Sequence, residues 1–156
     1  MKRISADVVI IGAGIVGSMC AHYVSKTGLK TLVIDRGTVA SGTTGAGEGN
    51  IMVSDKSPGP ELELALISRD LWFEVADDVG NEFELVAKGG LSVSRGDAGN
   101  LFALAESQIN VGVQATKVAT SEIRKLEPYI SEAIQSGVHY PQDAQCQPML
   151  AAAHIL

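Results

Sequence analysis

The chain has 156 residues, enough for one compact domain, and 46% of them are hydrophobic, as expected for a protein with a packed core. Its 18 acidic and 12 basic residues give a net charge of −6 and only 4% are aromatic, which argues against a basic, base-stacking surface for nucleic acid. The two cysteines and three histidines show no metal-ligand spacing, so we expect no metal site. Three glycines interrupt the apolar run near the start, which opposes a secretory signal, and no run of about 18 apolar residues predicts a membrane span. We therefore expect a cytoplasmic protein.

The first part of the sequence predicts a strand, a glycine turn, a helix and a second strand. Ala6–Ile11 is a β-branched run of the kind buried on both faces of a parallel sheet. Apolar residues at helical spacing follow over Gly14–Lys26, and Gly28 marks the end of this helix. Thr31–Ile34 is a second buried strand that ends at Asp35. This order of elements is that of a βαβ unit.

The middle of the sequence predicts a loop and then a mixture of helices and strands. Residues 37–49 are rich in Gly, Ser, Thr and Ala, which favours an irregular loop, and a short strand is expected at Asn50–Val53. Pro60 and Gly80 frame a long helix whose apolar stripe we expect to pack into a core. Further along we expect strands at Phe83–Ala87 and Leu91–Ser94, joined as a tight hairpin by Gly89-Gly90, and helices at Asn100–Asn110 and Ser121–Glu127.

The last ten residues, Gln147–Leu156, begin like a helix with Pro148 in the first turn, but they contain no helix stop. A helix end leaves about four carbonyls without partners. A dinucleotide-binding fold also needs more parallel strands than the two predicted here. We therefore expect the sequence to be the amino-terminal fragment of a longer protein.

A G-x-G-x-x-G pattern lies between the first strand and the helix. Gly12 permits the tight turn, Gly14 lets the backbone approach a pyrophosphate, and Gly17 lets the helix pack closely on the strand. Amide groups at the helix start would hold the phosphate charge. Asp35 is placed to accept hydrogen bonds from a ribose diol, which disfavours a 2′-phosphate, whereas Arg36 beside it could receive one.

The glycine pattern alone does not distinguish FAD from NAD. An NAD-binding domain usually returns to the sheet through a second helix, whereas this chain leaves Asp35 through the loop Ser41–Asn50 (SGTTGAGEGN). At this loop the sequence resembles the FAD-dependent amino-acid and amine oxidoreductases of the D-amino-acid oxidase family, in particular the glycine oxidase and sarcosine oxidase beta-subunit branch. The resemblance continues through the helix after Pro60, Gly89-Gly90-Leu91 and Tyr140–Gln145.

This resemblance implies an α/β fold, a Rossmann-like FAD-binding domain joined to the start of an α+β substrate domain. Residues 1–80 would be the amino-terminal part of the FAD domain, 81–145 part of the substrate domain, and 146–156 a truncated helix returning to the FAD domain. Glu48 departs from the small or apolar residue often found at its position, so a role as a surface carboxylate stays open. Besides the three glycines, the implied FAD contacts are Ile15 and Val16 at the pyrophosphate, Asp35 and Arg36 at the adenosine ribose, and Thr43, Thr44, Glu48, Gly49 and Asn50 along the pyrophosphate and flavin.

The resemblance also implies an activity, the oxidation of a C–N bond in an amino acid or secondary amine by hydride transfer to the flavin. The arginine and tyrosine that fix the substrate carboxylate in such enzymes would follow residue 156, so we name no catalytic residue. His139 and Asp143 are polar, and we expect them to bond to the backbone instead. Electrons would pass either to oxygen or to partner subunits. Two alternatives stay open: a non-catalytic nucleotide-binding remnant and an NAD-dependent dehydrogenase.

Overall fold

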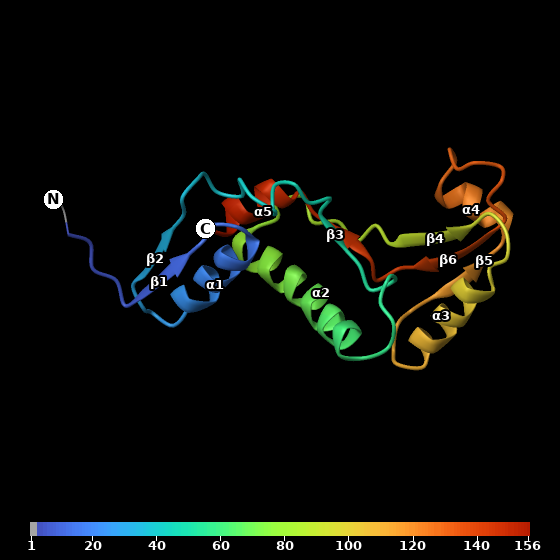
Figure 1. Cartoon of the computed structure of the whole chain (residues 1–156), viewed down its shortest axis with the longest axis horizontal. Helices are drawn as coiled ribbons and strands as arrows, with labels where there is room; N and C mark the ends of the chain where they lie inside the picture. Colours follow the sequence, from blue (N-terminus) through green and yellow to red (C-terminus); the bar gives the residue numbers. More distant parts are fainter. Residues whose placement is uncertain (1–2) are drawn as a thin grey trace. The chain divides into compact units, whose positions relative to one another are not determined.

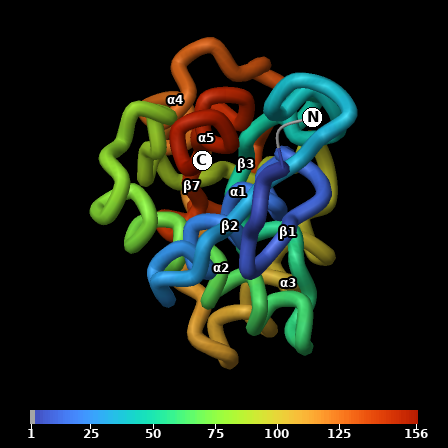
Figure 2. The backbone as a smooth tube through the Cα atoms, turned by 90° about the vertical axis from the view of Figure 1, so that its left-hand side faces the viewer, coloured from blue at the N-terminus to red at the C-terminus, as the bar shows by residue number. Residues whose placement is uncertain are grey.

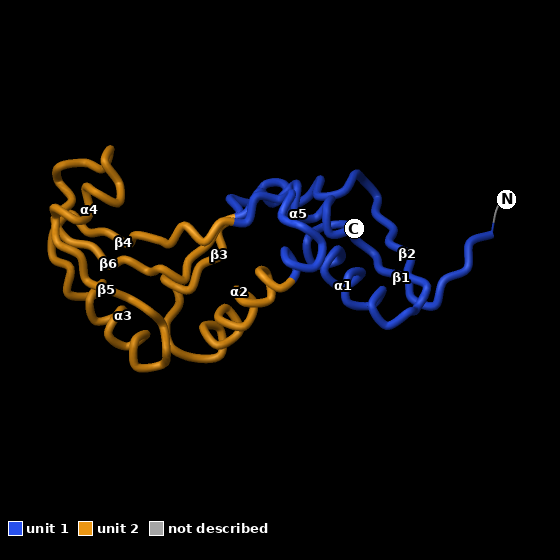
Figure 3. Tube along the Cα trace, turned by 180° about the vertical axis from the view of Figure 1, so that it is seen from behind, with its two compact units in different colours: residues 1–49, 75–85, 146–156 blue, residues 50–74, 86–145 orange. Residues whose placement is uncertain are grey.

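The computed structural model describes residues 3–156, so Met1 and Lys2, which begin the expected segment 1–80, lie outside the described residues. The chain forms two compact units, which Figure 3 shows in different colours. Unit 1 contains the residues up to 49 together with 75–85 and 146–156, and unit 2 contains 50–74 and 86–145. Residues 50–74 thus group with unit 2, although the segment 1–80 that we propose as a domain includes them.

Five helices and seven strands follow one another within the described residues (Figure 1). Each helix expected from the sequence is present, with ends that differ from the expected ones by a residue or two. The helices are α1 (Ile15–Ser25), α2 (Pro60–Val79), α3 (Gly99–Ile109), α4 (Thr120–Leu126) and α5 (Pro148–Ile155). The strands are β1 (Val8–Ile11), β2 (Thr31–Ile34), β3 (Asn50–Ile51), β4 (Gly90–Ser94), β5 (Thr116–Val118), β6 (Ser136–Tyr140) and β7 (Ala144–Gln145).

Unit 1 contains the predicted βαβ unit. β1 and β2 lie side by side as a parallel pair, with Val8 opposite Thr31 (Figure 1, Figure 2). α1 connects these strands and packs on α5, where the fully buried Ser18 donates a hydrogen bond from Oγ to the carbonyl oxygen of Ala152 at 3.0 Å. The helix that begins at Pro148 therefore stabilises the start of the chain, although more than a hundred residues separate them.

The expectation that the first two strands are buried on both faces is wrong for the described residues. Val9 is 53% exposed, Ile11 84% and Ile34 44%. Successive side chains in a strand point to opposite faces, so one covering layer hides only every second residue. A β-branched run indicates a strand that can be buried on both faces of its sheet. Here α1 and its neighbours cover only one face of β1.

Unit 2 is built on an antiparallel sheet in the order β4-β6-β5, with the short antiparallel pair β3-β7 beside it. The expected burial of the apolar stripe on α2 is confirmed at Leu62, which is 1% exposed, and Leu62 joins the core of this unit. The other fully or largely buried members of that core are Val53, Ala105, Val113, Val138 and Tyr140.

The predicted hairpin between Phe83–Ala87 and Leu91–Ser94 is wrong. Residues 83–87 follow an irregular path with a single bridge from Val86 to Gln145, and β4 pairs with β6 instead, where Gly90 lies opposite Tyr140. The apolar residues of this segment suggested a strand. Phe83 and Leu85 are buried and Val86 is 52% exposed, but burial of apolar side chains does not require a ladder. The partner strand β6 was missed because its sequence SGVHY contains Ser and Gly, which disfavour strands, and its pairing with β4 bridges more than forty residues.

Candidate functional site

A cavity of about 310 Å³ lies in unit 1, where α1 begins. It brings together three segments that the sequence analysis connected: the glycine turn, the residues after β2 and the Gly/Thr loop. The residues that line it are Gly14, Asp35, Arg36, Ala40, Ser41, Gly42, Thr43 and Thr44. Among the expected cofactor contacts, Gly14, Asp35, Arg36, Thr43 and Thr44 therefore face one cavity.

The glycines that shape this cavity have different tasks. Gly12 has φ of +114°, a conformation that other residues rarely adopt, and its N–H donates to the carbonyl oxygen of Ile34 at 2.8 Å. A β-carbon at Gly17 would lie 1.9 Å from the carbonyl oxygen of Gly12, so α1 approaches the turn more closely than any side chain allows. The close packing of helix on strand that the motif predicts is present in the structure.

The amino-terminal end of α1 faces the loop through Thr44. Gly14 caps the helix without a side chain, and the N–H of Ile15 donates to Thr44 Oγ1 at 3.0 Å. The amide therefore already points at an oxygen, and the hydroxyl keeps its own proton to donate. A hydroxyl donor beside the positive end of a helix suits an oxygen of a phosphate.

Asp35 has a role within the protein that the sequence did not reveal. Its Oδ2 accepts a hydrogen bond from the N–H of Ala13 at 2.7 Å, and its Oδ1 accepts one from the N–H of Gly37 at 2.8 Å. These bonds, that from Ala13 first, lower the pKa of the carboxyl group below its ordinary value, so Asp35 is charged at neutral pH. The carboxylate is exposed and each oxygen has a further lone pair, so it can still accept from a ribose hydroxyl.

The bonds to Asp35 predict a pH-dependent effect of the Asp35→Asn substitution. Because the folded chain favours the charged carboxylate, its pKa is lower in the folded than in the unfolded state. The stabilisation is complete above the unfolded pKa and is lost as the pH falls through the folded pKa. We expect Asp35→Asn to lower the free energy of unfolding at neutral pH and to have little effect well below about pH 4. Urea unfolding of both proteins at the two pH values measures this; an equal difference at both would contradict it.

Several expected contacts lie outside the lining of this cavity. Val16 is 75% exposed on α1, and Glu48 is exposed on the loop. Gly49 has φ of +74°, and a β-carbon on it would lie 2.0 Å from the carbonyl oxygen of Cys146, so it packs against the segment before α5. Asn50 begins β3 and lines a second cavity, which belongs to unit 2. The contacts of these residues with a cofactor stay predictions.

Three lining residues, Ala40, Ser41 and Gly42, were not among the expected contacts. Ala40 is buried, has φ of +57°, and its N–H donates to the carbonyl oxygen of Ala13 at 3.0 Å. This bond fixes the loop against the glycine turn. The composition of the loop indicated an irregular path, but the position of Ala40 depends on a contact with a distant residue and has no local sequence signal.

The expected role of Asp143 is confirmed. Asp143 is 3% exposed, and its Oδ1 accepts from the N–H groups of Val53 and Ser54 at 2.8 and 3.2 Å. His139 is half-buried and lines the cavity of unit 2 together with Asn50.

Among residues 3–156, no group of three or more His, Cys, Asp and Glu side chains is arranged to hold a metal ion. None of the helices in the same range is both long and apolar enough to cross a membrane.

Comparison with known proteins identifies the family of the chain and several similar proteins. A family model described as DAO, FAD dependent oxidoreductase, matches residues 7–156. Glycine oxidase from Geobacillus kaustophilus (strain HTA426) is 27% identical over 157 residues, which cover 94% of this chain and 42% of that protein. Monomeric sarcosine oxidase from Arthrobacter sp. (strain TE1826) is 27% identical over 130 residues, which cover 80% of this chain and 33% of that protein.

A solved structure confirms the fold class. The crystal structure of glycine oxidase from Geobacillus kaustophilus matches with a TM-score of 0.88 and 25% identity, over 96% of this chain and 43% of that one. The α/β, Rossmann-like fold expected from the sequence is therefore confirmed. The chain spans less than half the length of the relatives that it matches.

Proposed function

Because the chain belongs to the FAD dependent oxidoreductase family, we propose that unit 1 holds the pyrophosphate and adenosine ribose of FAD in the cavity at the start of α1. The observation that carries this proposal is the bond from the Ile15 N–H to Thr44 Oγ1 above Gly14. It holds the Thr44 hydroxyl, which keeps its own proton to donate, at the edge of the cavity beside a residue without a side chain. Phosphate oxygens need this combination of access and donors.

The carboxylate of Asp35 suits an adenosine ribose better than a 2′-phosphate. The backbone bonds to Asp35 keep its carboxylate charged, and it lines the cavity together with Arg36. A ribose diol donates hydrogen bonds to a carboxylate, whereas a phosphate at the same place would be repelled by it. This supports an unphosphorylated dinucleotide such as FAD. NAD also has such a ribose, so the family, and not Asp35, is what favours FAD.

For the whole protein we propose the oxidation of the C–N bond of an amino acid or secondary amine. The support is the similarity to proteins described as glycine oxidase and monomeric sarcosine oxidase. When bound, FAD supplies the hydride acceptor, and the protein supplies orientation and exclusion of water. We further propose that the protein is cytoplasmic and that the electrons pass from the flavin to oxygen or to partner subunits.

The proposed activity predicts a visible change in the flavin. We expect the whole protein, purified with added FAD, to show the yellow flavin absorption and to bleach when glycine or sarcosine is added without oxygen. Added NADH should leave the spectrum unchanged if amines are the electron donors. A protein that binds FAD but is bleached by none of a panel of amino acids and secondary amines would contradict the activity and leave the FAD site in place.

A further inference from the structure

The part of α2 that belongs to unit 2 has two apolar faces on opposite sides. Leu62 is 1% exposed and belongs to the core of the unit, and Leu66 packs against that core. Leu64, Ile67 and Leu71, by contrast, are 67, 59 and 37% exposed. Residues three, four and seven positions apart share one side of a helix, so these three form a stripe on the side opposite Leu62. This stripe is called the outer face of α2 below.

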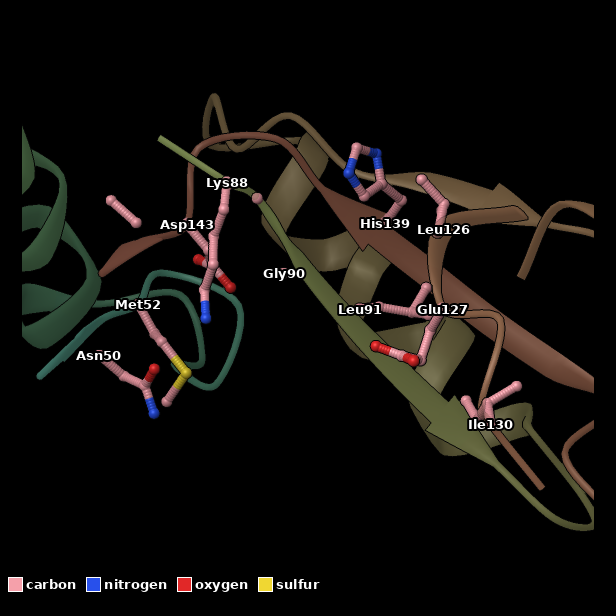
Figure 4. Close-up of a pocket in the computed structure, with 12 residues that line it drawn as sticks. Asn50, Met52, Lys88, Gly90, Leu91, Leu126, Glu127, Ile130, His139 and Asp143 are labelled. Atoms are coloured by element: carbon pink, nitrogen blue, oxygen red, sulfur yellow. The ribbon is translucent and has the colours of Figure 1, made fainter. Parts of the chain in front are cut away.

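The outer face of α2 is separate from both cavities of the molecule described above. The cavity of about 450 Å³ in unit 2 is lined by residues of β3, β4, β6 and β7 and by the end of α4 with the residues after it, and α2 contributes no residue to its lining (Figure 4). The cavity at the start of α1 has no lining residue from α2 either. The outer face is therefore an apolar surface that neither site uses.

Acidic residues border the outer face on both sides. In a heptad with Leu64 and Leu71 at position a and Ile67 at position d, the neighbouring e and g positions are the ones that meet a partner helix. These positions are Glu61 and Ser68 at e, and Glu63 and Asp70 at g. All four side chains are exposed. The apolar stripe is thus flanked by three carboxylates and one hydroxyl.

Two of these carboxylates are not neutralised within the chain. Asp70 forms an ion pair with Arg69, in which Nη1 and Oδ1 are 2.8 Å apart. Glu61 and Glu63 belong to none of the ion pairs within residues 3–156. One of them lies on each side of the stripe, so a helix placed there would meet negative charge at both of its edges.

This charge pattern disfavours a second copy of the same helix as the partner. In a parallel pair of helices the g position of one faces the e position of the other, and in an antiparallel pair g faces g and e faces e. Both arrangements would bring Glu61 and Glu63 against carboxylates of the second copy. Like charges placed together suppress association, whereas Lys or Arg at the e and g positions of a partner would complement this surface.

We propose that the outer face of α2 binds a basic amphipathic helix of another protein. Its apolar side chains contact Leu64, Ile67 and Leu71, and its Lys or Arg side chains lie beside Glu61 and Glu63. The apolar contacts supply the affinity, and the charge pairs select a basic partner. The net charge of −6 on the chain favours the approach of such a partner. This interaction uses no residue of the proposed FAD site.

The test is the binding of a synthetic helical peptide of three heptads, with Leu at a and d and Lys at e and g, to the whole protein purified with FAD. A second peptide has Glu in place of every Lys, so it keeps the apolar stripe and reverses the charge. Fluorescence anisotropy of the labelled peptides measures both affinities. We expect the Lys peptide to bind at least about tenfold more tightly than the Glu peptide and to lose affinity as salt rises, because salt screens exposed charges.

Two substitutions separate the apolar part of the surface from the charged part. Ile67→Gln should weaken binding of the Lys peptide about tenfold, because it removes an apolar contact. Glu63→Lys should weaken the Lys peptide about fivefold and strengthen the Glu peptide. The matched controls are Ile109→Gln and Glu132→Lys, which change exposed residues of unit 2 outside α2 and should bind both peptides like the unmodified protein. Cooperative urea unfolding shows that each variant is folded.

Several results would overturn the proposal. One is a Lys peptide that does not bind, or that binds folded Ile67→Gln as tightly as Ile109→Gln. Another is a dimer of the whole protein that Ile67→Gln dissociates, because a second copy would then cover the face. A third is a Lys peptide that binds the chain of residues 1–156 but not the whole protein, because another part of the whole protein would then cover it.

FAD binding by the same sample separates this inference from the proposed function. A protein that binds FAD but not the Lys peptide refutes the docking surface alone. A protein that binds the Lys peptide but not FAD refutes the FAD site alone.

Discussion

Gly17→Ala is expected to abolish FAD binding and to destabilise unit 1 by about 4 kcal/mol or more. The added β-carbon would lie 1.9 Å from the carbonyl oxygen of Gly12, which is backbone and bonded into the turn. The clash can be relieved only if α1 moves away from β1, and this movement separates the Ile15 N–H from Thr44. We expect urea unfolding to show the lost stability and FAD fluorescence titration to show no binding at concentrations that saturate the unmodified chain.

Gly96→Ala is the control for this substitution. No heavy atom lies within 4 Å of a β-carbon added at Gly96, so the change should alter the free energy of unfolding by less than about 0.5 kcal/mol. It should also leave FAD binding intact. If Gly17→Ala were as stable as Gly96→Ala and bound FAD, the close approach of α1 to the glycine turn would not be what forms the site.

Gln108→Leu is expected to have the largest effect in unit 2, a loss of roughly 3 to 5 kcal/mol. Gln108 is fully buried, and its Nε2 donates to the carbonyl oxygens of Val53, Ser54 and Lys56 at 3.3, 3.1 and 2.6 Å. Its Oε1 accepts from the hydroxyl of Tyr140 at 2.9 Å. Leucine has a similar volume but removes the amide, so the Tyr140 hydroxyl and the Ser54 carbonyl lose this partner, whereas the Val53 carbonyl keeps the Lys56 N–H. The loss of hydrogen bonds by buried polar groups is destabilising.

The expected loss in Gln108→Leu can be located as well as measured. Urea unfolding gives the free energy, and amide hydrogen exchange should show faster exchange at Val53 and Ser54, because the segment that Gln108 holds would open. Gln114→Leu is the control, since Gln114 is exposed and its side chain has no such role. Similar stability of the two variants would contradict the importance of the buried amide.

The sequence predicted the parts of the fold that depend on neighbouring residues. The βαβ unit follows from glycine spacing and from apolar runs, and α2 follows from Pro60 and a helical stripe, all of which are local signals. β5 and β6 form a sheet through partners far away in the chain, and the residues of β6 carry no strong strand preference. The exposed face of β1 was unpredictable for the same reason, because burial depends on what packs against a strand.

The candidate site was predicted to a similar extent. Gly14, Asp35 and Thr44 face one cavity, as the motif and the resemblance implied. The bonds from backbone amides to Asp35 could not be predicted, since they depend on how the turn before α1 meets the loop after β2.

The most direct test of the central claim is a titration of the chain with FAD, followed by flavin fluorescence and calorimetry, with NAD titrated in parallel. We expect one FAD to bind per chain, ADP to compete with it because both carry adenosine and pyrophosphate, and NAD to bind more weakly. A folded chain, shown by cooperative urea unfolding, that binds neither FAD nor ADP would contradict the FAD site in unit 1.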